Sequence, residues 1–381
     1  MSAAKPPKRR AMVGWYDPRV LAHSGYQVAI ANVFGRHSDT RLIEALASQP
    51  QAEFDYSAVQ GDFWFDYVSD VGDGWNSTYA IADAIATPDL PVGSETLHPG
   101  RVLIFGGDEV YPYPSRGEYD VRTETPYRHA FAGRARPDVF AIPGNHDWYD
   151  SLVSFSRTFC RPERGFAGCA TRQTRSYFAL KLPANWWLMA IDLQLGAELD
   201  EPQVQYFQRV AAHMDASARL IFCVPEPRWI LEDAYPAHET YGELASTRFL
   251  EDQVFKRKAH VFLTGDQHYY KRHENAAGVQ KITSGGGGAF LHPTHAPNTE
   301  RLRSGFVQRA AYPDAKTSRR LSWKNFLFPF INPKSGWMYA FVYAMSAWLA
   351  SAGLRAADVI DLPTAMSAAL NVAIRSTACG S

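Results

Sequence analysis

This sequence has no excess of positive or negative charge. Its 381 residues include 39 lysines and arginines and 39 aspartates and glutamates, so the formal net charge at pH 7 is zero. Proteins dedicated to nucleic-acid binding usually carry a large basic excess. We therefore expect no dedicated nucleic-acid partner, and any charged substrate has to be held by a local group of side chains.

Cysteine is scarce, and the few cysteines form no recognisable motif. The four residues Cys160, Cys169, Cys223 and Cys379 contain no CxxC pair and no zinc-type spacing. This usage is typical of a reducing compartment, although Cys160 and Cys169 could pair in an exported protein. The basic N-terminus has no apolar run behind it, so a cleavable signal peptide is not predicted. We expect a cytoplasmic protein, with membrane association as the alternative.

Long uncharged segments are also rare, with one exception near the C-terminus. Residues 336–354 contain no charged side chain and are flanked by Lys334 and Arg355. A run of this length approaches that of a membrane-spanning helix, but alanine, serine and glycine dilute its hydrophobicity. Two interpretations stay open at this point: a helix that packs on the domain, and a segment that contacts a membrane.

The sequence does contain enough apolar residues for a large core. With 46% hydrophobic and 20% charged residues, the chain is typical of a globular protein. Apolar runs that end in polar, glycine-containing loops alternate with helical patterns, which predicts a layered α/β fold. The predicted strands are residues 63–68, 101–105, 138–142, 186–191, 219–224, 260–264 and 280–283. The predicted helices are about 76–86, 150–159 and 202–214.

Three regions follow from this pattern. Residues 1–60 carry no motif and are interpreted as an N-terminal extension, and residues 61–298 form the expected catalytic domain. The polar stretch 293–318 is predicted to be a loop at the end of that domain. Residues 299–381 are then an apolar C-terminal tail, with membrane association as one interpretation.

Side chains typical of metal sites follow four of the predicted strands. They are Asp70, Asp108, the pair Asn145 and His146, and His268. Ligands of α/β sheets collect beyond the carboxyl ends of the strands, so we expect these side chains to converge. Carboxylate, amide and imidazole ligands can surround two divalent ions, which together activate a water for phosphoryl displacement.

The segment Gly144-Asn145-His146-Asp147 is the most specific of these elements. Together with the other ligands and the glycine run 285–288, it resembles the calcineurin-like metallophosphoesterase family from about Asp62 to His295. The resemblance implies a metallophosphoesterase-type β-sandwich flanked by helices.

The resemblance also implies a role for each matching residue. Asp70 and His268 would bind the first metal, Asp108 would bridge the two metals, and Asn145 would bind the second. His146 would act as the general acid, with Asp147 holding its ring in the productive tautomer.

The sequence departs from the family pattern at three ligand positions. Gly72 stands where the first motif usually has a histidine, and Asp266 replaces the first histidine of the closing motif, as an oxygen ligand of the second metal. No histidine follows the fifth strand, where Glu226 is the only candidate substitute. Fewer imidazoles favour two divalent ions such as manganese, iron or magnesium over zinc.

Several neighbouring residues keep two interpretations each. Asp73 either caps the following helix or supplies the oxygen that Gly72 cannot, with the cap favoured. His292 and His295 follow the glycine run and could contact substrate. Glu109 and Tyr111 follow Asp108 and either line the pocket or form a turn.

The predicted function is hydrolysis of phosphoester bonds by a metal-activated hydroxide, with His146 as general acid. The substrate would be a phosphorylated small molecule or a lipid. The alternative is a catalytically impaired relative that serves as a binding or membrane-docking module, because Gly72, Asp266 and the absent histidine weaken the metal site.

Overall fold

The computed structural model of this chain describes residues 9–30, 51–193, 199–230, 243–296 and 299–356. Cys379 and the last part of the predicted tail, 357–381, lie outside these ranges. The chain forms two compact units, which we describe separately. The first comprises Met1–Val13 and His23–Ser322, and the second Gly14–Ala22 and Trp323–Ser381.

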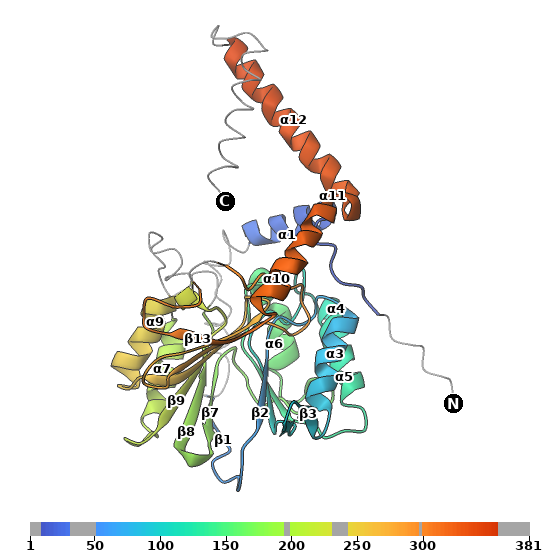
Figure 1. Cartoon of the computed structure of the whole chain (residues 1–381). Helices are drawn as coiled ribbons and strands as arrows, with labels where there is room; N and C mark the ends of the chain where they lie inside the picture. Colours follow the sequence, from blue (N-terminus) through green and yellow to red (C-terminus); the bar gives the residue numbers. More distant parts are fainter. Residues whose placement is uncertain (1–8, 31–50, 194–198, 231–242, 297–298, 357–381) are drawn as a thin grey trace, which may run out of the picture. The chain divides into compact units, whose positions relative to one another are not determined.

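Two large β-sheets form the centre of the first unit (Figure 1). The larger sheet has eight strands in the order β1-β7-β8-β9-β10-β12-β11-β13, and the smaller has the order β2-β5-β6. Strands β2, β5 and β6 are parallel, as are β8, β9, β10 and β12. The strands of the larger sheet are Phe54–Asp55 (β1), Phe178–Leu182 (β7), Trp186–Ala190 (β8), Arg219–Cys223 (β9), Ala259–Thr264 (β10), Tyr270–Glu274 (β11), Gln280–Ser284 (β12) and Val307–Tyr312 (β13). Those of the smaller sheet are Phe65–Val68 (β2), Val102–Phe105 (β5) and Asp138–Ala141 (β6), and a separate hairpin joins Leu90–Val92 (β3) to Glu95–Leu97 (β4).

Helices cover the outer faces of both sheets. In Figure 1, α3, α4 and α5 lie beside the smaller sheet, and α7 and α9 lie against the larger one. The helices are Pro18–Ile30 (α1), Trp75–Ala86 (α3), Arg116–Glu118 (α4), Thr125–Ala130 (α5), Val153–Phe159 (α6), Glu201–Ala211 (α7), Glu243–Phe249 (α9), Ala315–Ser322 (α10), Phe328–Ile331 (α11) and Pro333–Ala356 (α12). This order of layers is the expected β-sandwich flanked by helices.

The alternation of side chains along each strand divides the core into layers. All four residues of β5 are buried: Val102 and Ile104 face the other sheet, whereas Leu103 and Phe105 pack against the helices. Because both faces of β5 are covered, it is a continuous apolar run rather than an alternating one. The carboxyl ends of the parallel strands thereby remain as the place for polar residues.

All seven predicted strands are present, and so are the three predicted helices. Helix α3 is preceded by Gly74 as N-cap, without a side-chain cap. The expected loop 293–318 was only partly correct, because β13 pairs with β11 and the first unit continues to Ser322. The strand was missed because its sequence, VQRAAY, lacks the apolar alternation of a half-buried strand.

The second unit consists mainly of α11 and α12. The ring of Tyr16 packs edge-on against Phe328 at a centroid distance of 4.5 Å, and Ser335 Oγ donates a hydrogen bond to the Tyr16 carbonyl. Large apolar side chains on this unit are nevertheless exposed, among them Phe330, Trp337 and Trp348. No helix within the described ranges has both the length and the apolar character needed to cross a membrane.

We expect the Phe140→Ala variant to lose about 3–5 kcal/mol of unfolding free energy, the usual effect of emptying a buried aromatic site. Phe140 is fully buried between the sheets, with the rings of Phe54 and Phe178 both at 4.9 Å. Urea denaturation followed by circular dichroism measures the loss. The control Val153→Ala, on an exposed side chain, should stay within about 0.5 kcal/mol of wild type. Equal stability of both variants would contradict this assignment of the core.

Candidate metal centre

The hydroxyl of Tyr111 lies at the meeting point of three strand ends. It is 3.0 Å from Asp70 Oδ1, which follows β2, and 3.0 Å from Asp108 Oδ2, which follows β5. It is also 3.0 Å from Nε2 of His268, which follows β10. His268 Nε2 is itself 3.2 Å from Asp70 Oδ1. Three of the predicted ligands therefore converge, although they come from separate parts of the chain.

The backbone turns sharply at each aspartate of the centre. Asp70, Asp108 and Asp266 have φ angles of 60°, 55° and 64°, in the left-handed region that non-glycine residues rarely adopt. Such conformations cost on the order of 1–3 kcal/mol each and persist only where the surrounding structure fixes them. Hydrogen bonds from Asp70 N to Gly107 O and from Val71 N to Asp108 O hold two of these turns together. These hydrogen bonds therefore hold the backbone at Asp70 and Asp108 in a strained conformation that brings the two carboxylates together.

The gathered carboxylates repel one another. Burial raises the pKa of Asp108 well above its ordinary value, and the charges of Asp70, Asp147 and Asp266 raise it further. Burial and the charge of Asp70 likewise raise the pKa of Asp266. A cation among these groups would remove the repulsion. The electrostatics of the centre therefore favour a bound metal ion.

His268 has the orientation of a metal ligand. Its Nδ1 lies 2.7 Å from the Phe290 carbonyl, which can only accept, so Nδ1 carries the proton. Nε2 faces Asp70 and Tyr111, and in the neutral ring its lone pair would be available to a metal. Burial by itself lowers the pKa of His268, but the hydrogen bond and charge of Asp70 outweigh it, so the pKa is raised.

His146 is fixed beside the same carboxylates. Its backbone N–H donates to Asp108 Oδ1 at 2.9 Å, and its Nδ1 lies 2.8 Å from the Pro112 carbonyl. The ring packs against Tyr111 and Tyr149 at centroid distances of 4.5 and 4.8 Å. Burial lowers the pKa of His146 to about 4. Since Nδ1 is committed to the carbonyl, Nε2 is the atom through which this ring exchanges a proton.

Asp147 was expected to orient the His146 ring, but its carboxylate accepts hydrogen bonds from other residues. Its Oδ2 accepts from the backbone N–H groups of Gly144 at 2.8 Å and Glu109 at 3.3 Å, and its Oδ1 accepts from the Tyr119 hydroxyl. The chain enters the 3₁₀ helix Asp147–Asp150 directly after His146, which turns this carboxylate back toward the preceding loop. Asp147 therefore braces two loops, and the Pro112 carbonyl orients the His146 ring.

The structure explains why no histidine occupies position 72. Gly72 has a φ of 76°, and a Cβ added there would overlap the carbonyl oxygen of Glu109. The Tyr111 hydroxyl instead supplies the additional polar group beside Asp70. The sequence pattern indicated only that Tyr111 lines the pocket or forms a turn. The available signal was its position three residues after Asp108, which brings its hydroxyl back to the strand end.

Asn145 and Asp266, the residues predicted to bind the second metal, are both hydrogen-bonded to other side chains. Asn145 Nδ2 donates to the Tyr149 hydroxyl at 3.3 Å, and Asp266 Oδ2 accepts from Gln267 Nε2 at 2.8 Å. Glu226, the candidate substitute for the absent histidine, forms an ion pair of 2.7 Å with Arg228. Among the described His, Cys, Asp and Glu side chains, no three are close enough to hold a metal without another type of residue. The Tyr111 hydroxyl is a further polar group that lies 3.0 Å from side-chain atoms of Asp70, Asp108 and His268.

Two of the remaining candidates, Asp73 and His292, form hydrogen bonds with loops that carry site residues. Asp73 neither caps α3 nor replaces the ligand missing at Gly72, because its two oxygens accept from the backbone N–H groups of Val13 at 2.8 Å and Phe290 at 3.3 Å. The ring of His292 is stacked on His268 at 4.2 Å, and its Nδ1 accepts from the His268 backbone N–H.

The last candidate, His295, is hydrogen-bonded to another element. Its Nδ1 lies 2.7 Å from the hydroxyl of Ser318 on α10. None of the described cysteines, Cys160, Cys169 and Cys223, forms a disulfide bond. His295 therefore bonds to α10, and the cysteine pair considered from the sequence is not formed.

Comparison with known families agrees with this arrangement. The family model described as calcineurin-like phosphoesterase matches residues 63–270, which is more than half of the chain. The chain belongs to the calcineurin-like phosphoesterase family. The matched range contains all the metal ligands predicted from the sequence, so the family assignment and the convergence of strand ends concern the same part of the molecule.

The chain is also similar, at low sequence identity, to several solved structures. GAP50, described as the anchor in the inner membrane complex of Plasmodium, is 12% identical with a TM-score of 0.38, and the match covers 65% of this chain and 76% of that one. The purple acid phosphatase PPD1 from yellow lupin seeds is 15% identical with a TM-score of 0.41, covering 67% and 49%. A dimetal phosphatase from Danio rerio is 13% identical with a TM-score of 0.33, covering 58% and 86%. None of the curated proteins compared with this chain matches it.

We expect the wild-type chain to bind at least one manganese or iron ion and the Asp108→Asn variant to lose it, because this carboxylate faces both halves of the centre. Elemental analysis after gel filtration measures the metal content, and thermal unfolding measures the stabilisation. Saturation at 100 times the dissociation constant would add about 2.7 kcal/mol. The control Asp89→Asn changes an exposed carboxylate and should retain the metal. Equal metal content in the two variants would refute the assignment of Asp108.

Proposed function

We propose that this chain is a metal-dependent hydrolase of phosphoester bonds. The observation that carries the proposal is the convergence of Asp70, Asp108 and His268 on the Tyr111 hydroxyl, all within 3.0 Å of it. Family membership supplies the reaction class. The buried, mutually repelling carboxylates supply a physical reason for a cation at this place.

The side chains present fit a first metal ion better than a second. Asp70, Asp108, Tyr111 and His268 would hold the first ion with mixed oxygen and nitrogen ligands, which suits iron or manganese. Asp108, Asn145 and Asp266 would hold the second with oxygen atoms alone, which suits manganese or magnesium and weaker binding. When bound, such ions lower the pKa of a water and neutralise charge on the phosphoryl group.

In this proposal, the chain itself supplies a general acid, His146, whose ring is held in place. The Pro112 carbonyl fixes the His146 ring through Nδ1, and the hydrogen bond from His146 N to Asp108 fixes its backbone. A phosphoryl dianion beside the ring favours the protonated imidazole, although burial lowers its pKa in the free protein. In our proposal, His146 Nε2 then donates its proton to the departing oxygen of the substrate.

A binding protein of low activity is the second candidate. The specific observation in its favour is the second-ion side of the centre, where Glu226 is paired with Arg228 and no described side chain contributes an imidazole. The two candidates differ in metal dependence. An enzyme should gain turnover in proportion to the metal bound, whereas a binding protein should bind metal or ligand with no turnover.

We also propose that the second unit docks on a lipid surface. Phe330, Trp337 and Trp348 are 81%, 79% and 62% exposed, and α12 carries charges only at Lys334 and Arg355, near its two ends. Exposed apolar surfaces of this kind mark interaction sites. Tryptophan and tyrosine are enriched where membranes meet water. A phosphorylated lipid is accordingly one of the substrates to be tested.

We expect His146→Ala to lower the turnover of a generic phosphomonoester such as p-nitrophenyl phosphate by ~10²- to 10⁴-fold, the usual contribution of one general acid. Metal content should stay close to that of wild type, because His146 is not among the proposed ligands. The control His98→Ala removes an exposed histidine paired with Asp89 and should leave turnover unchanged. Unchanged turnover in His146→Ala would exclude its role as acid.

Flotation with phosphatidylcholine vesicles, with and without phosphatidylserine, tests the lipid surface. We expect the full chain to float with the vesicles and the double variant Phe330→Ser, Trp337→Ser to stay in the dense fraction, because the exposed aromatic area is lost. Val92→Ser changes an exposed apolar residue of β3 and serves as control. A wild-type chain that never floats would eliminate the lipid proposal without affecting the hydrolase proposal.

A further inference from the structure

Helix α10 carries three cations on one face. Lys316, Arg319 and Arg320 are three and four positions apart, so they lie on the same side of the helix, and all three are exposed. The opposite side is attached to the first unit, because Ser318 is 3% exposed and its hydroxyl accepts at 3.0 Å from the backbone N–H of Thr294. Lys316, Arg319 and Arg320, which we call the basic face of α10, therefore lie away from that attachment.

The three cations of this face are not paired with carboxylates. Within the described ranges, no ion pair or hydrogen bond joins their charged ends to another side chain. Asp314, the nearest acidic residue along the chain, uses Oδ1 to accept from the backbone N–H groups of Lys316 and Thr317 at 2.9 and 3.0 Å. Since this carboxylate is bonded to the first turn of the helix, the face keeps an excess of positive charge.

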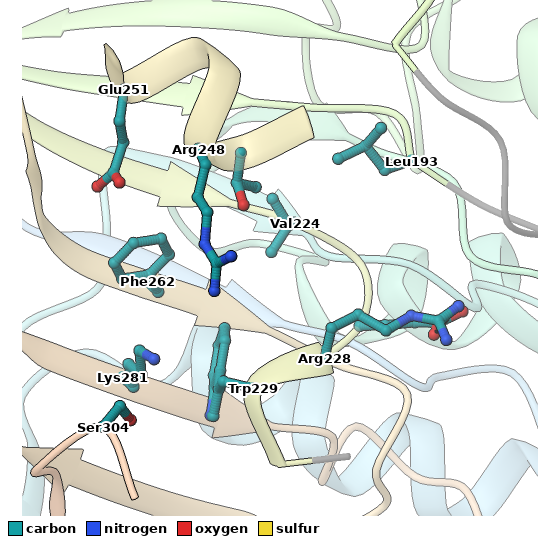
Figure 2. Close-up of a pocket in the computed structure, with 11 residues that line it drawn as sticks. Leu193, Val224, Arg228, Trp229, Arg248, Glu251, Phe262, Lys281 and Ser304 are labelled. Carbon is teal, nitrogen blue, oxygen red and sulfur yellow. Dashed lines mark ion pairs between the residues drawn. The ribbon is translucent and has the colours of Figure 1, made fainter. Parts of the chain in front are cut away.

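Two cations at a cavity of the same unit differ in this respect. Figure 2 shows Arg228 and Lys281 at this cavity, which lies between α9 and strands β10 and β12. Arg228 pairs with Glu226 at 2.7 Å, and Lys281 Nζ lies 4.3 Å from the centroid of the Phe306 ring. Because these cations already have partners in the chain, the basic face of α10 is the stronger candidate for an interaction surface.

The sequence around α10 is positively charged, although the whole chain is neutral. In residues 312–356 the only acidic residue is Asp314. The same range contains six basic residues: Lys316, Arg319, Arg320, Lys324, Lys334 and Arg355. Each unit therefore has its own attraction for a negatively charged surface, because these residues fall on both sides of the boundary at Ser322.

Exposed aromatic side chains occur in the same stretch of sequence. Tyr312, directly before α10, is 72% exposed, and Trp323 and Phe326, which follow it, are 71% and 73% exposed. Cations combined with exposed aromatic residues are typical of segments that bind anionic membranes, where rings enter the headgroup region and cations meet the negative charge. Nucleic-acid binding fits less well, because it usually requires a larger basic excess than this chain has.

We propose that the basic face of α10 binds the anionic surface of a lipid bilayer. The three cations would contact the phosphate and carboxylate groups of lipids such as phosphatidylserine. This inference rests on the lipid docking proposed for the second unit, and it adds the headgroup charge that the bilayer needs and a contact from the first unit. Each lysine or arginine near an anionic bilayer strengthens binding about fivefold, so the three together contribute about a hundredfold.

Sedimentation of the full chain with phosphatidylcholine vesicles, with and without phosphatidylserine, measures the two affinities. We expect wild type to bind the vesicles with phosphatidylserine about a hundredfold more tightly or better. The triple variant Lys316→Gln, Arg319→Gln, Arg320→Gln should lose about a hundredfold of this affinity, and glutamine preserves the helix because it has a similar helix propensity. Affinity for phosphatidylcholine alone should change little.

A matched control removes the same charge from other helices. Arg116, Arg157 and Arg209 are exposed on α4, α6 and α7, and their joint substitution by glutamine should preserve the preference for phosphatidylserine. Raising the salt from 0.1 to 1 M shortens the screening length from about 10 to about 3 Å, which should weaken wild-type binding to the anionic vesicles selectively. Circular dichroism checks the folding of each variant. If the triple variant does not fold, the single variant Arg320→Gln should still lose about fivefold.

Three results would overturn this inference. Equal wild-type affinity for the two kinds of vesicle, or an equal loss in the triple variant and its control, would refute the basic face and leave the lipid docking of the second unit in place. Binding of duplex DNA through the same three cations, without a preference for anionic vesicles, would assign the face to nucleic acid instead. A wild-type chain that binds neither kind of vesicle would refute both lipid proposals. The hydrolase proposal is unaffected, because these measurements require neither metal nor turnover.

Discussion

The mutual repulsion of buried carboxyl groups is the constraint on which the centre of this molecule depends. Asp70, Asp108 and Asp266 follow different strands. The charges of Asp70 and Asp266 raise the pKa of Asp108, and the charge of Asp70 raises that of Asp266. The fold holds them in left-handed backbone conformations, which cost free energy even before the repulsion is counted. A cation bound there, as we propose, would offset both costs, and the Tyr111 hydroxyl lies 3.0 Å from Asp70, Asp108 and His268.

The fold makes this convergence possible through two features. Parallel strands bring their carboxyl ends to one edge of each sheet, and the residues next to the aspartates are small enough for the loops to touch. Gly144 illustrates the second feature, because a Cβ there would overlap the Asp108 carboxylate. Gly287 is similar, since a Cβ would overlap the Ser69 carbonyl beside Asp70. The two sheets can therefore place ligands from opposite sides of the sandwich around one point.

The strands and the convergence of Asp70, Asp108 and His268 could be predicted from the sequence, because buried parallel strands are continuous apolar runs that end at polar residues. Contacts between loops could not be predicted in this way. Asp147 follows His146 in the sequence, but a 3₁₀ turn directs its carboxylate to Gly144 and Glu109 instead. Tyr111 was underestimated because the polar end of an aromatic side chain reaches several ångströms from its backbone, and no local pattern shows where it ends.

Asp73 shows how the N-terminal segment supports the centre. Its carboxylate accepts from Val13 on one side and from Phe290 on the other, and the Phe290 carbonyl in turn orients His268. Val13 is thus connected to His268, a proposed metal ligand, through the Asp73 carboxylate and the backbone of Phe290. Because a buried carboxylate without its donors is costly, loss of either contact would loosen the loop that fixes the His268 tautomer. Val13, in the segment interpreted as an extension, therefore contributes a hydrogen bond to the loops around His268.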